Sequence, residues 1–314
     1  MVRVKIINTQ AFKDLVKTGR PSFRVVPVDA TWYMPNIPAN GKLQFLNEER
    51  LPNAAFFDLD EVCLPSSKTP YPHMLADYDT LNRNLNNLGL NRTDKLVFYD
   101  KSGIFSSPRA AWNMILAGHK QVFLLDHFKD YKASGAPLDT EEIAFTATDA
   151  LEASLEYDII EEEEYDQNYQ KQVIEYEELF DLVKSGQLGS KYITFDARAT
   201  PRFTGEAPEP REGLSSGHIP SSLSLPFNKV LTENGNYKSK QEILDLFKTE
   251  FNLDLTKPLE GKEGIIVMCG TGVTAVILRL AIESVAESKI PIRVYDGSWT
   301  EWAQRAPSEF IEKV

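Results

Sequence analysis

The chain repeats itself at an interval of 167 to 170 residues, and this repeat limits the folds open to it. The segment DLVKTG at 14–19 returns as DLVKSG at 181–186, and VDATW returns as FDARA. The later runs KLVFYD and VFLLD return, in the same order, as IIVMC and IRVYD. Two copies at this period predict two tandem domains rather than a repeat solenoid.

The predicted domains are 1–138 and 173–314, each long enough to bury a core of its own. Between them, residues 139–172 include the acidic stretch LEASLEYDIIEEEEYDQNYQKQ, which is poor in periodic apolar residues. This composition is typical of a linker. We therefore expect an acidic linker that partly wraps the two domains.

Within each copy, short β-branched runs alternate with helical patterns. In the second copy KYITFDA, GIIVM and PIRVYD are typical of strands, while QEILDLFKTEF and TAVILRLAIESVA are typical of helices. The alternation predicts an α/β fold, in which each domain has a mostly parallel sheet flanked by helices on both faces. In such sheets, functional residues gather beyond the carboxyl ends of the strands.

Charge and composition exclude several classes of function. The net charge of −12 argues against nucleic acid and against an anionic membrane as direct partners. No run approaches the roughly 18 apolar residues that a membrane span needs. Two cysteines and four histidines predict neither a disulfide framework nor a metal site, and no cofactor is expected. A reducing compartment follows, with the cytoplasm expected and a mitochondrial location left open by the basic N-terminal residues.

One cysteine lies in a loop that suits chemistry. The sequence CGTGVT follows the GIIVM run and comprises Cys269, Gly270, Thr271, Gly272, Val273 and Thr274. Its glycines let successive N–H groups point inward, and the next helix presents its positive end, so the loop would stabilise a thiolate or a persulfide anion. Cys269 is therefore the predicted nucleophile. Cys63, in DLDEVCLPSS, has no such loop and is interpreted as a packing residue.

The duplication and the CGTGVT loop resemble the tandem rhodanese family, in its 3-mercaptopyruvate sulfurtransferase branch. The likeness spans nearly the whole chain and includes VDATWYMP, PYPHML, SSPRAAW, GEAPEPREGLSSGHIP and YDGSWTEW. It is greatest to fungal members, some of which supply sulfur for transfer-RNA thiolation. The resemblance implies that the N-terminal copy has lost its cysteine, with Asp100 in that place, and that the C-terminal copy is catalytic.

The resemblance also implies which residues bind the substrate. Arg202 and Arg211 match the family's substrate-binding arginines, and a 2-oxo carboxylate suits guanidinium groups, which fork onto two oxygens. Salt bridges to the acids of the same loop, Glu206, Glu209 and Glu212, are the alternative. Arg198 and His218 are interpreted as structural.

A proton relay is implied as well, because the attacking thiol loses a proton and the pyruvate enolate gains one. Thr271 and His73 match two of its members in the family. The third member, an aspartate, does not carry over, since no acid lies at the matching place before His73. Asp60 and Glu61, the nearest acids before His73, are the alternatives for this member.

Three other functions compete with a mercaptopyruvate sulfurtransferase. A thiosulfate sulfurtransferase would want cations where Gly270 and Thr271 lie. A cysteine phosphatase needs an arginine six positions after the cysteine, where this chain has Ala275. A non-catalytic binding module would not need Cys269 with both arginines. Thioredoxin, glutathione, cyanide and a protein sulfur relay are the candidate sulfur acceptors.

Overall fold

The computed structural model describes residues 2–20, 23–143 and 161–314. The chain divides into two compact units, one of residues 1–65 with Leu75–Asp166 and one of Ser66–Met74 with Gln167–Val314. These units differ from the predicted domains, because Ser66–Met74 packs with the second unit although it lies in the first half of the chain. Part of the predicted linker, residues 144–160, lies outside the described residues. Its last part is helical, in α7 (Glu162–Gln172).

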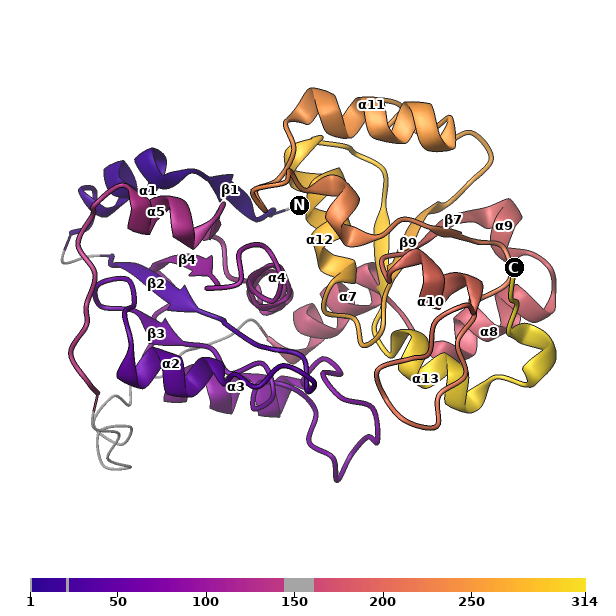
Figure 1. Ribbon diagram of the computed structural model, residues 1–314, viewed down its shortest axis with the longest axis horizontal. Helices are drawn as coiled ribbons and strands as arrows, with labels where there is room; N and C mark the ends of the chain where they lie inside the picture. The colour runs from indigo at the N-terminus through magenta and orange to yellow at the C-terminus, as the bar shows by residue number, and fades with distance from the viewer. Residues whose placement is uncertain (1, 21–22, 144–160) are drawn as a thin grey trace. The chain divides into compact units, whose positions relative to one another are not determined.

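The first unit contains a five-stranded parallel sheet with the order β1-β5-β4-β2-β3 (Figure 1). Its strands are β1 (Lys5–Ile7), β2 (Val25–Asp29), β3 (Ala55–Phe56), β4 (Lys95–Tyr99) and β5 (Val122–Leu125). Its helices are α1 (Thr9–Val16), α2 (Gly41–Asn47), α3 (Tyr78–Asn87), α4 (Ser107–Leu116) and α5 (Phe128–Ala133).

The second unit repeats this arrangement as β6-β10-β9-β7-β8, again parallel throughout. Its strands are β6 (Val173–Ile174), β7 (Tyr192–Asp196), β8 (Ser222–Ser224), β9 (Gly264–Met268) and β10 (Ile292–Tyr295). Its helices are α8 (Tyr176–Lys184), α9 (Leu188–Lys191), α10 (Thr200–Thr204), α11 (Lys240–Phe251), α12 (Ala275–Leu280) and α13 (Ser298–Arg305). Short 3₁₀ turns lie at Phe227–Val230 and Ser308–Phe310.

Helices cover both faces of each sheet, as the alternating pattern predicts. In the second unit, Ile266 and Met268 of β9 form one core with the aromatic side chains of α8 and α13. On the other face, Phe195 of β7 packs edge-on against Phe247 and Phe251 of α11. This burial places the carboxyl end of β9, where the CGTGVT loop begins, between the two layers of helices.

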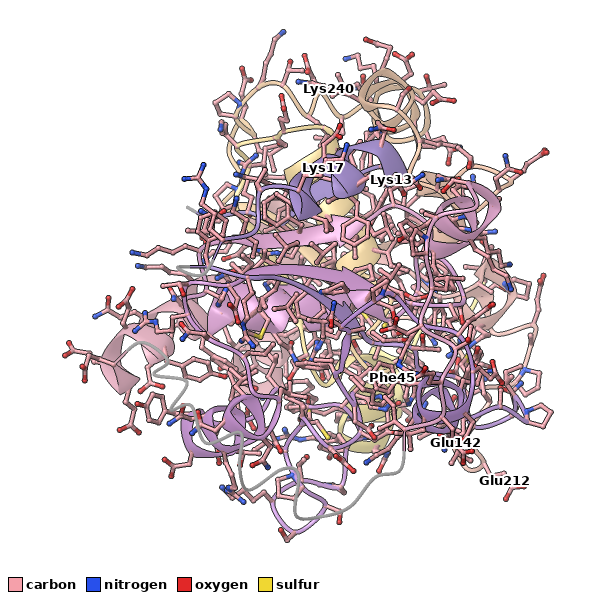
Figure 2. All side chains as sticks on the ribbon, turned by 90° about the vertical axis from the view of Figure 1, so that its left-hand side faces the viewer. Lys13, Lys17, Phe45, Glu142, Glu212 and Lys240 are labelled. Carbon is pink, nitrogen blue, oxygen red and sulfur yellow. The ribbon has the colours of Figure 1, made fainter. Side chains whose placement is uncertain are left out.

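Local signals in the sequence set several helix ends. The Oγ of Ser239 accepts the N–H of Glu242, whose carboxylate accepts the N–H of Ser239, so α11 begins with a capping box. In α1, Phe12 is buried, while Lys13 and the C-cap residue Lys17 lie on the outside of the first unit (Figure 2). The expected helix at 274–286 is regular only to Leu280 and continues as the π-helical turn Ala281–Val285. No helix in the described ranges is both long and apolar enough to span a bilayer.

Candidate active site

Cys269 is the first residue after β9 and is only 2% exposed. Gly272 has a positive φ of 75°, a conformation that residues with a side chain rarely adopt, so the glycine permits this turn into α12. Val273 is buried and Thr274 is the N-cap residue of α12. The loop thus holds a thiol between the end of a buried strand and the start of a helix.

The beginning of α13 fixes the backbone of this loop. Ser298 Oγ accepts the N–H of Cys269 at 3.1 Å, while Trp299 and Thr300 donate their N–H groups to the carbonyls of Cys269 and Gly270 at 3.0 and 2.9 Å. In a trans peptide, the C=O of one residue and the N–H of the next point in opposite directions. The N–H groups of Gly270 and Thr271 therefore point away from α13, as an anion-binding nest requires.

Thr271 lies against His73, and these are the two residues for which the family resemblance implies a relay. The Nδ1 of His73 is 3.1 Å from Oγ1 of Thr271, and both side chains are buried. His73 belongs to Ser66–Met74, the segment that packs with the second unit, and it has a φ of 63°. This contact joins a loop hydroxyl to an imidazole, a pair that can carry a proton.

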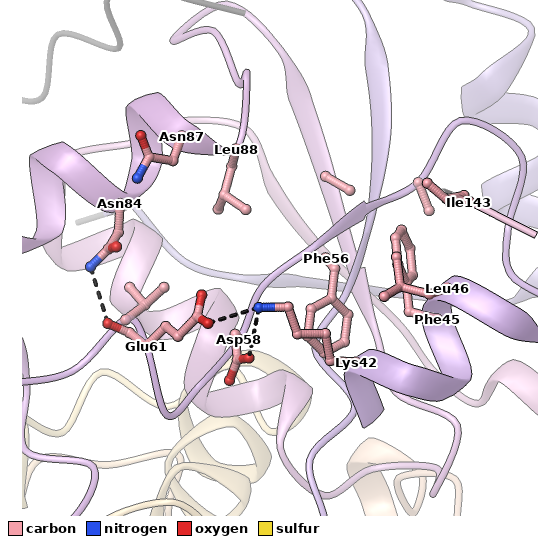
Figure 3. A pocket seen from close by; sticks show the side chains of 13 residues that line it. Lys42, Phe45, Leu46, Phe56, Asp58, Glu61, Asn84, Asn87, Leu88 and Ile143 are labelled. Carbon is pink, nitrogen blue, oxygen red and sulfur yellow. Dashed lines mark hydrogen bonds and ion pairs between the residues drawn. The ribbon is translucent and has the colours of Figure 1, made fainter. Parts of the chain in front are cut away.

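The two acids that most closely precede His73 in the sequence, Asp60 and Glu61, have partners in the first unit. Both carboxylate oxygens of Asp60 accept the indole N–H of Trp32 at 3.1 Å. Glu61 Oε1 is 2.7 Å from Lys42 Nζ, at a cavity of about 460 Å³ in that unit (Figure 3). Cys63 Sγ lies 3.1 Å from the carbonyl oxygen of Asp60. Nothing in these contacts assigns Asp60 or Glu61 to a relay.

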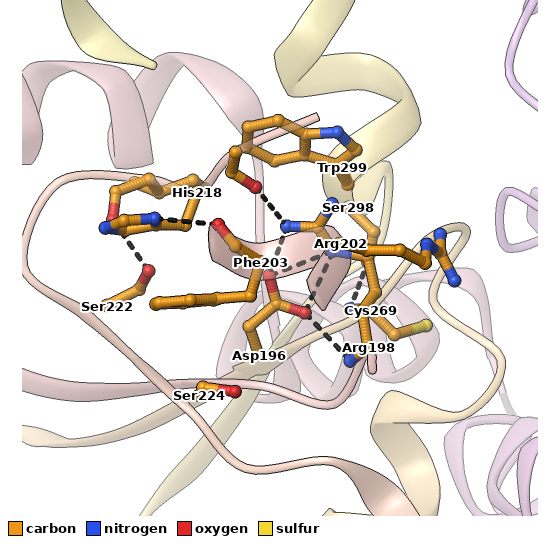
Figure 4. Close-up of polar contacts among 12 residues, drawn as sticks. Asp196, Arg198, Arg202, Phe203, His218, Ser222, Ser224, Cys269, Ser298 and Trp299 are labelled. Atoms are coloured by element: carbon orange, nitrogen blue, oxygen red, sulfur yellow. Dashed lines mark hydrogen bonds and ion pairs between the residues drawn. The ribbon is translucent and has the colours of Figure 1, made fainter. Parts of the chain in front are cut away.

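Arg202 lies beside the cysteine loop and is also in an ion pair. Its Nη2 is 3.4 Å from the place that a Cβ on Gly270 would occupy. Its Nε donates to Oε1 of Glu209 at 3.1 Å, and its Nη2 contacts the other carboxylate oxygen. The salt bridge considered as the alternative is therefore present, and it coexists with proximity to the loop. Figure 4 shows Arg202 and Cys269 in this group of side chains.

Arg198 has the structural surroundings expected from its place in DARA. It donates to Asp196 through Nε and Nη2, and its guanidinium lies 4.1 Å over the ring of Trp299. Burial would lower the pKa of Arg198, but the charges of Asp196 and Glu209 outweigh burial and raise it. His218 stacks on Phe203 with ring centroids 3.9 Å apart.

Arg211 lines a cavity of about 500 Å³ within the second unit. Its walls are Pro70, Pro72, Arg211, Glu212, Gly213, Leu214, Thr300 and Gln304. Two of these wall residues neighbour the site, since Pro72 precedes His73 and the N–H of Thr300 donates to the carbonyl of Gly270. His73 and Arg202 thus lie directly beside the loop, and Arg211 lines a cavity whose walls include neighbours of His73 and of Gly270.

Comparisons with known proteins identify relatives over nearly the whole chain. The rhodanese-like domain model matches residues 176–305. Thiosulfate sulfurtransferase TUM1 of Saccharomyces cerevisiae is 38% identical, over 98% of this chain and 97% of its own length. The 3-mercaptopyruvate sulfurtransferase of Mus musculus is 34% identical over 98% of this chain and 94% of its own. The chain belongs to the rhodanese family. The crystal structure of Tum1 from Saccharomyces cerevisiae superposes with a TM-score of 0.85, at 38% identity, over 99% of this chain and 98% of that one.

The first rhodanese-like unit of this sulfurtransferase contains a nest occupied by its own side chain. Asp100 follows β4, and its Oδ2 accepts the N–H groups of Phe105, Ser106 and Ser107 at 3.0 to 3.1 Å. Burial raises the pKa of Asp100 above its ordinary value, although these hydrogen bonds oppose that effect. The loop in this unit binds an internal carboxylate, which has no sulfur to transfer.

The sequence did not indicate the contact of Ser298 with the cysteine loop. It also did not indicate that Glu209 is buried between two arginines. Ser298 has a φ of 52° and donates its hydroxyl to the carbonyl of Tyr295 while accepting from Cys269. The GSW motif after β10 was available as a signal, but its contact with the cysteine loop depends on the sheet order. Among the described residues, no group of three or more His, Cys, Asp or Glu is placed to hold a metal ion.

Ser298→Ala should destabilise the second unit, because the buried N–H of Cys269 loses its acceptor. We expect the free energy of unfolding to fall by about 1–3 kcal/mol, measured by urea denaturation. Ser308→Ala, at an exposed serine near the same end of the chain, is the control and should be within about 0.5 kcal/mol of the unmodified protein. Equal stabilities for the two variants would refute the role given to the Ser298 hydroxyl.

Proposed function

We propose that this rhodanese transfers sulfur from 3-mercaptopyruvate to a thiol acceptor through a persulfide on Cys269. In the first step the thiolate attacks the sulfur of the donor, an S–S bond forms and the donor C–S bond breaks. The electron pair of that bond leaves on the pyruvate enolate, which takes up a proton to give pyruvate. In the second step an acceptor thiol removes the outer sulfur and Cys269 is regenerated.

The observation that carries the proposal is the loop geometry at Cys269. The α13 contacts direct the N–H groups of Gly270 and Thr271 to one side, where they can stabilise the anionic forms of sulfur. His73 and Thr271 are proposed to pass the proton that the enolate needs. Arg202 and Arg211 are proposed to bind the carboxylate and the ketone of the donor.

The charges around the loop support mercaptopyruvate as the donor. Gly270 and Thr271 are uncharged, Arg202 beside them is paired with Glu209, and the nearby cavity is lined by one cation, Arg211, and one acid, Glu212. These surroundings suit a donor with a single carboxylate better than dianionic thiosulfate. Thiosulfate is the second candidate donor, because the name of the yeast TUM1 relative specifies a thiosulfate sulfurtransferase. A protein sulfur relay or thioredoxin is the proposed acceptor.

Steady-state kinetics with both donors test the assignment. We expect kcat/KM for mercaptopyruvate to exceed that for thiosulfate by at least about tenfold, or about 1.4 kcal/mol, with the same acceptor. Equal kcat/KM values for the two donors, or a higher value for thiosulfate, would assign the protein to the thiosulfate-using branch. No turnover with either donor would leave a binding module as the remaining interpretation.

A further inference from the structure

Glu209 lies between two arginines in the second unit and is almost completely buried. Only 3% of its side chain is exposed, against 1% for Arg198 and 20% for Arg202. Its Oε1 accepts from Nη1 of Arg198 at 2.8 Å and from Nε of Arg202 at 3.1 Å. A buried carboxylate is costly unless its hydrogen bonds are satisfied, and here two guanidinium groups satisfy them.

Arg198, the second arginine bonded to Glu209, is held in place by several contacts. Arg198 is bonded to Asp196 at the end of β7, donates to the carbonyl of Gly217 at 2.7 Å and stacks on Trp299. Arg198 is therefore held by a strand, a loop and a helix at once. Glu209 transmits this fixed position to Arg202, whose guanidinium it contacts through both Nε and Nη2.

This contact orients Arg202 relative to the cysteine loop. A guanidinium has two edges that can fork onto a carboxylate, one formed by Nε and Nη2 and one formed by Nη1 and Nη2. Glu209 uses the first edge, so the second edge is the one left for a substrate. The same contact holds Nη2 3.4 Å from the Cβ position of Gly270.

The charges in this cluster balance. Asp196 and Glu209 carry two negative charges, and Arg198 and Arg202 carry two positive charges. The cluster therefore adds no excess charge to attract an anion, and the contribution of Arg202 depends on its direction. A side chain that fixes this direction affects substrate binding without touching the substrate.

We infer that Glu209 is a positioning residue, which holds Arg202 in the orientation that binds the donor carboxylate beside Cys269. The inference rests on the proposed function, since it assigns Arg202 to the donor. The other acids of the loop do not share this role, because Glu206 is exposed and Glu212 lines the neighbouring cavity.

Glu209→Gln tests the inference, with Glu206→Gln as a control that removes one charge from the same loop. Glu209→Gln should raise KM for mercaptopyruvate at least about tenfold and change kcat by less than about threefold. The reason is that Arg202, once misdirected, loses its hydrogen bonds to the donor carboxylate, and these bonds form already in the ground state. In Glu209→Gln, the rate at which neutral iodoacetamide alkylates Cys269 should depend on pH as it does in the unmodified protein. Glu206→Gln should match the unmodified protein in each measurement.

A double-mutant cycle separates positioning from general damage to the fold. In an Arg202→Ala background, Glu209→Gln should change KM by less than about twofold, because the group that it orients is gone. Glu209→Asp keeps the buried charge but is one methylene shorter, so it should fold and raise KM by a smaller factor. Additive effects in the cycle, or failure of both Glu209 variants to fold, would show that the Glu209 carboxylate only stabilises the fold. Either result would overturn the inference.

The same experiments distinguish this inference from the proposed function. If the unmodified protein forms no persulfide with mercaptopyruvate or thiosulfate, the proposed function fails. If the unmodified protein turns over mercaptopyruvate and Glu209→Gln behaves as Glu206→Gln does, only the role of Glu209 is rejected.

Discussion

Cys269→Ser is expected to abolish sulfur transfer, lowering kcat/KM by at least about 1,000-fold, as loss of a nucleophile generally does. A serine hydroxyl is a weak nucleophile without a dedicated base, and it cannot form the persulfide. The backbone contacts of the loop with Ser298, Trp299 and Thr300 do not involve the Cys269 side chain, so the fold should survive. Sulfur transfer assayed on the purified, folded variant provides the measurement.

Cys63→Ser is the matched control for this prediction. Cys63 is half-buried in the first unit, and its sulfur contacts the carbonyl oxygen of Asp60. We expect the variant to retain most of the activity of the unmodified protein. Activity that survives in Cys269→Ser and disappears in Cys63→Ser would show that Cys63, and not Cys269, is the nucleophile.

Arg211→Ala and Arg202→Ala are each expected to lower kcat/KM for mercaptopyruvate by about 2–4 kcal/mol, or roughly 30- to 1,000-fold. Each arginine is proposed to make charge-assisted hydrogen bonds to the donor, so most of the loss should appear as a raised KM. Arg→Lys should restore only part of the activity, because an ammonium cannot fork onto two oxygens. Lys229→Ala, which removes an exposed cation paired with Glu250, should leave the kinetics unchanged.

The two arginines should differ in their effect on stability. Arg202 shares Glu209 with Arg198, so Arg202→Ala removes one of two partners of a buried carboxylate and should lower Tm. Arg211 is only partly buried and lines a cavity, so Arg211→Ala should lower Tm less than Arg202→Ala does. Large losses of Tm in both variants, with KM for mercaptopyruvate unchanged, would make both arginines structural. The next candidate for the substrate site would then be Arg109, which lies in the SSPRAAW segment at the start of α4.

Most of the fold could be predicted from local patterns. The apolar run GIIVM forms the buried strand β9 with the predicted bounds. The parallel sheets follow from the alternation of strands and helices. Cys269 at the carboxyl end of β9 follows from the same pattern, because the glycines end the strand directly after it. These features depend on residues that are close in the sequence, where hydrophobic period and turn chemistry are informative.

The features that could not be predicted depend on contacts between distant residues. Ser66–Met74 packs with the second unit, which no pattern within those nine residues indicates. The π-helical turn after Leu280 accompanies the buried ion pair of Arg279 with Glu283, and regular helical spacing concealed it. Glu209 could be named as a salt-bridge partner, but its burial between two arginines depends on how the loop folds back.

The loop in the first unit supports the interpretation of the loop in the second. Asp100 shows that the residue after β4 points its side chain into converging backbone N–H groups, which bind an anion there. By the repeat, Cys269 holds the corresponding position after β9. A helix start of this kind favours a negative group, which in the first unit is the Asp100 carboxylate and in the second is the proposed persulfide.

Mass spectrometry of the protein after treatment with mercaptopyruvate tests the central claim most directly. We expect the intact protein to gain the mass of one sulfur atom, and peptide mapping to place that sulfur on the peptide containing Cys269. Addition of an excess of dithiothreitol should remove the sulfur and restore the original mass. A stable absence of the added sulfur, or its location on Cys63 with Cys269 unmodified, would contradict the account.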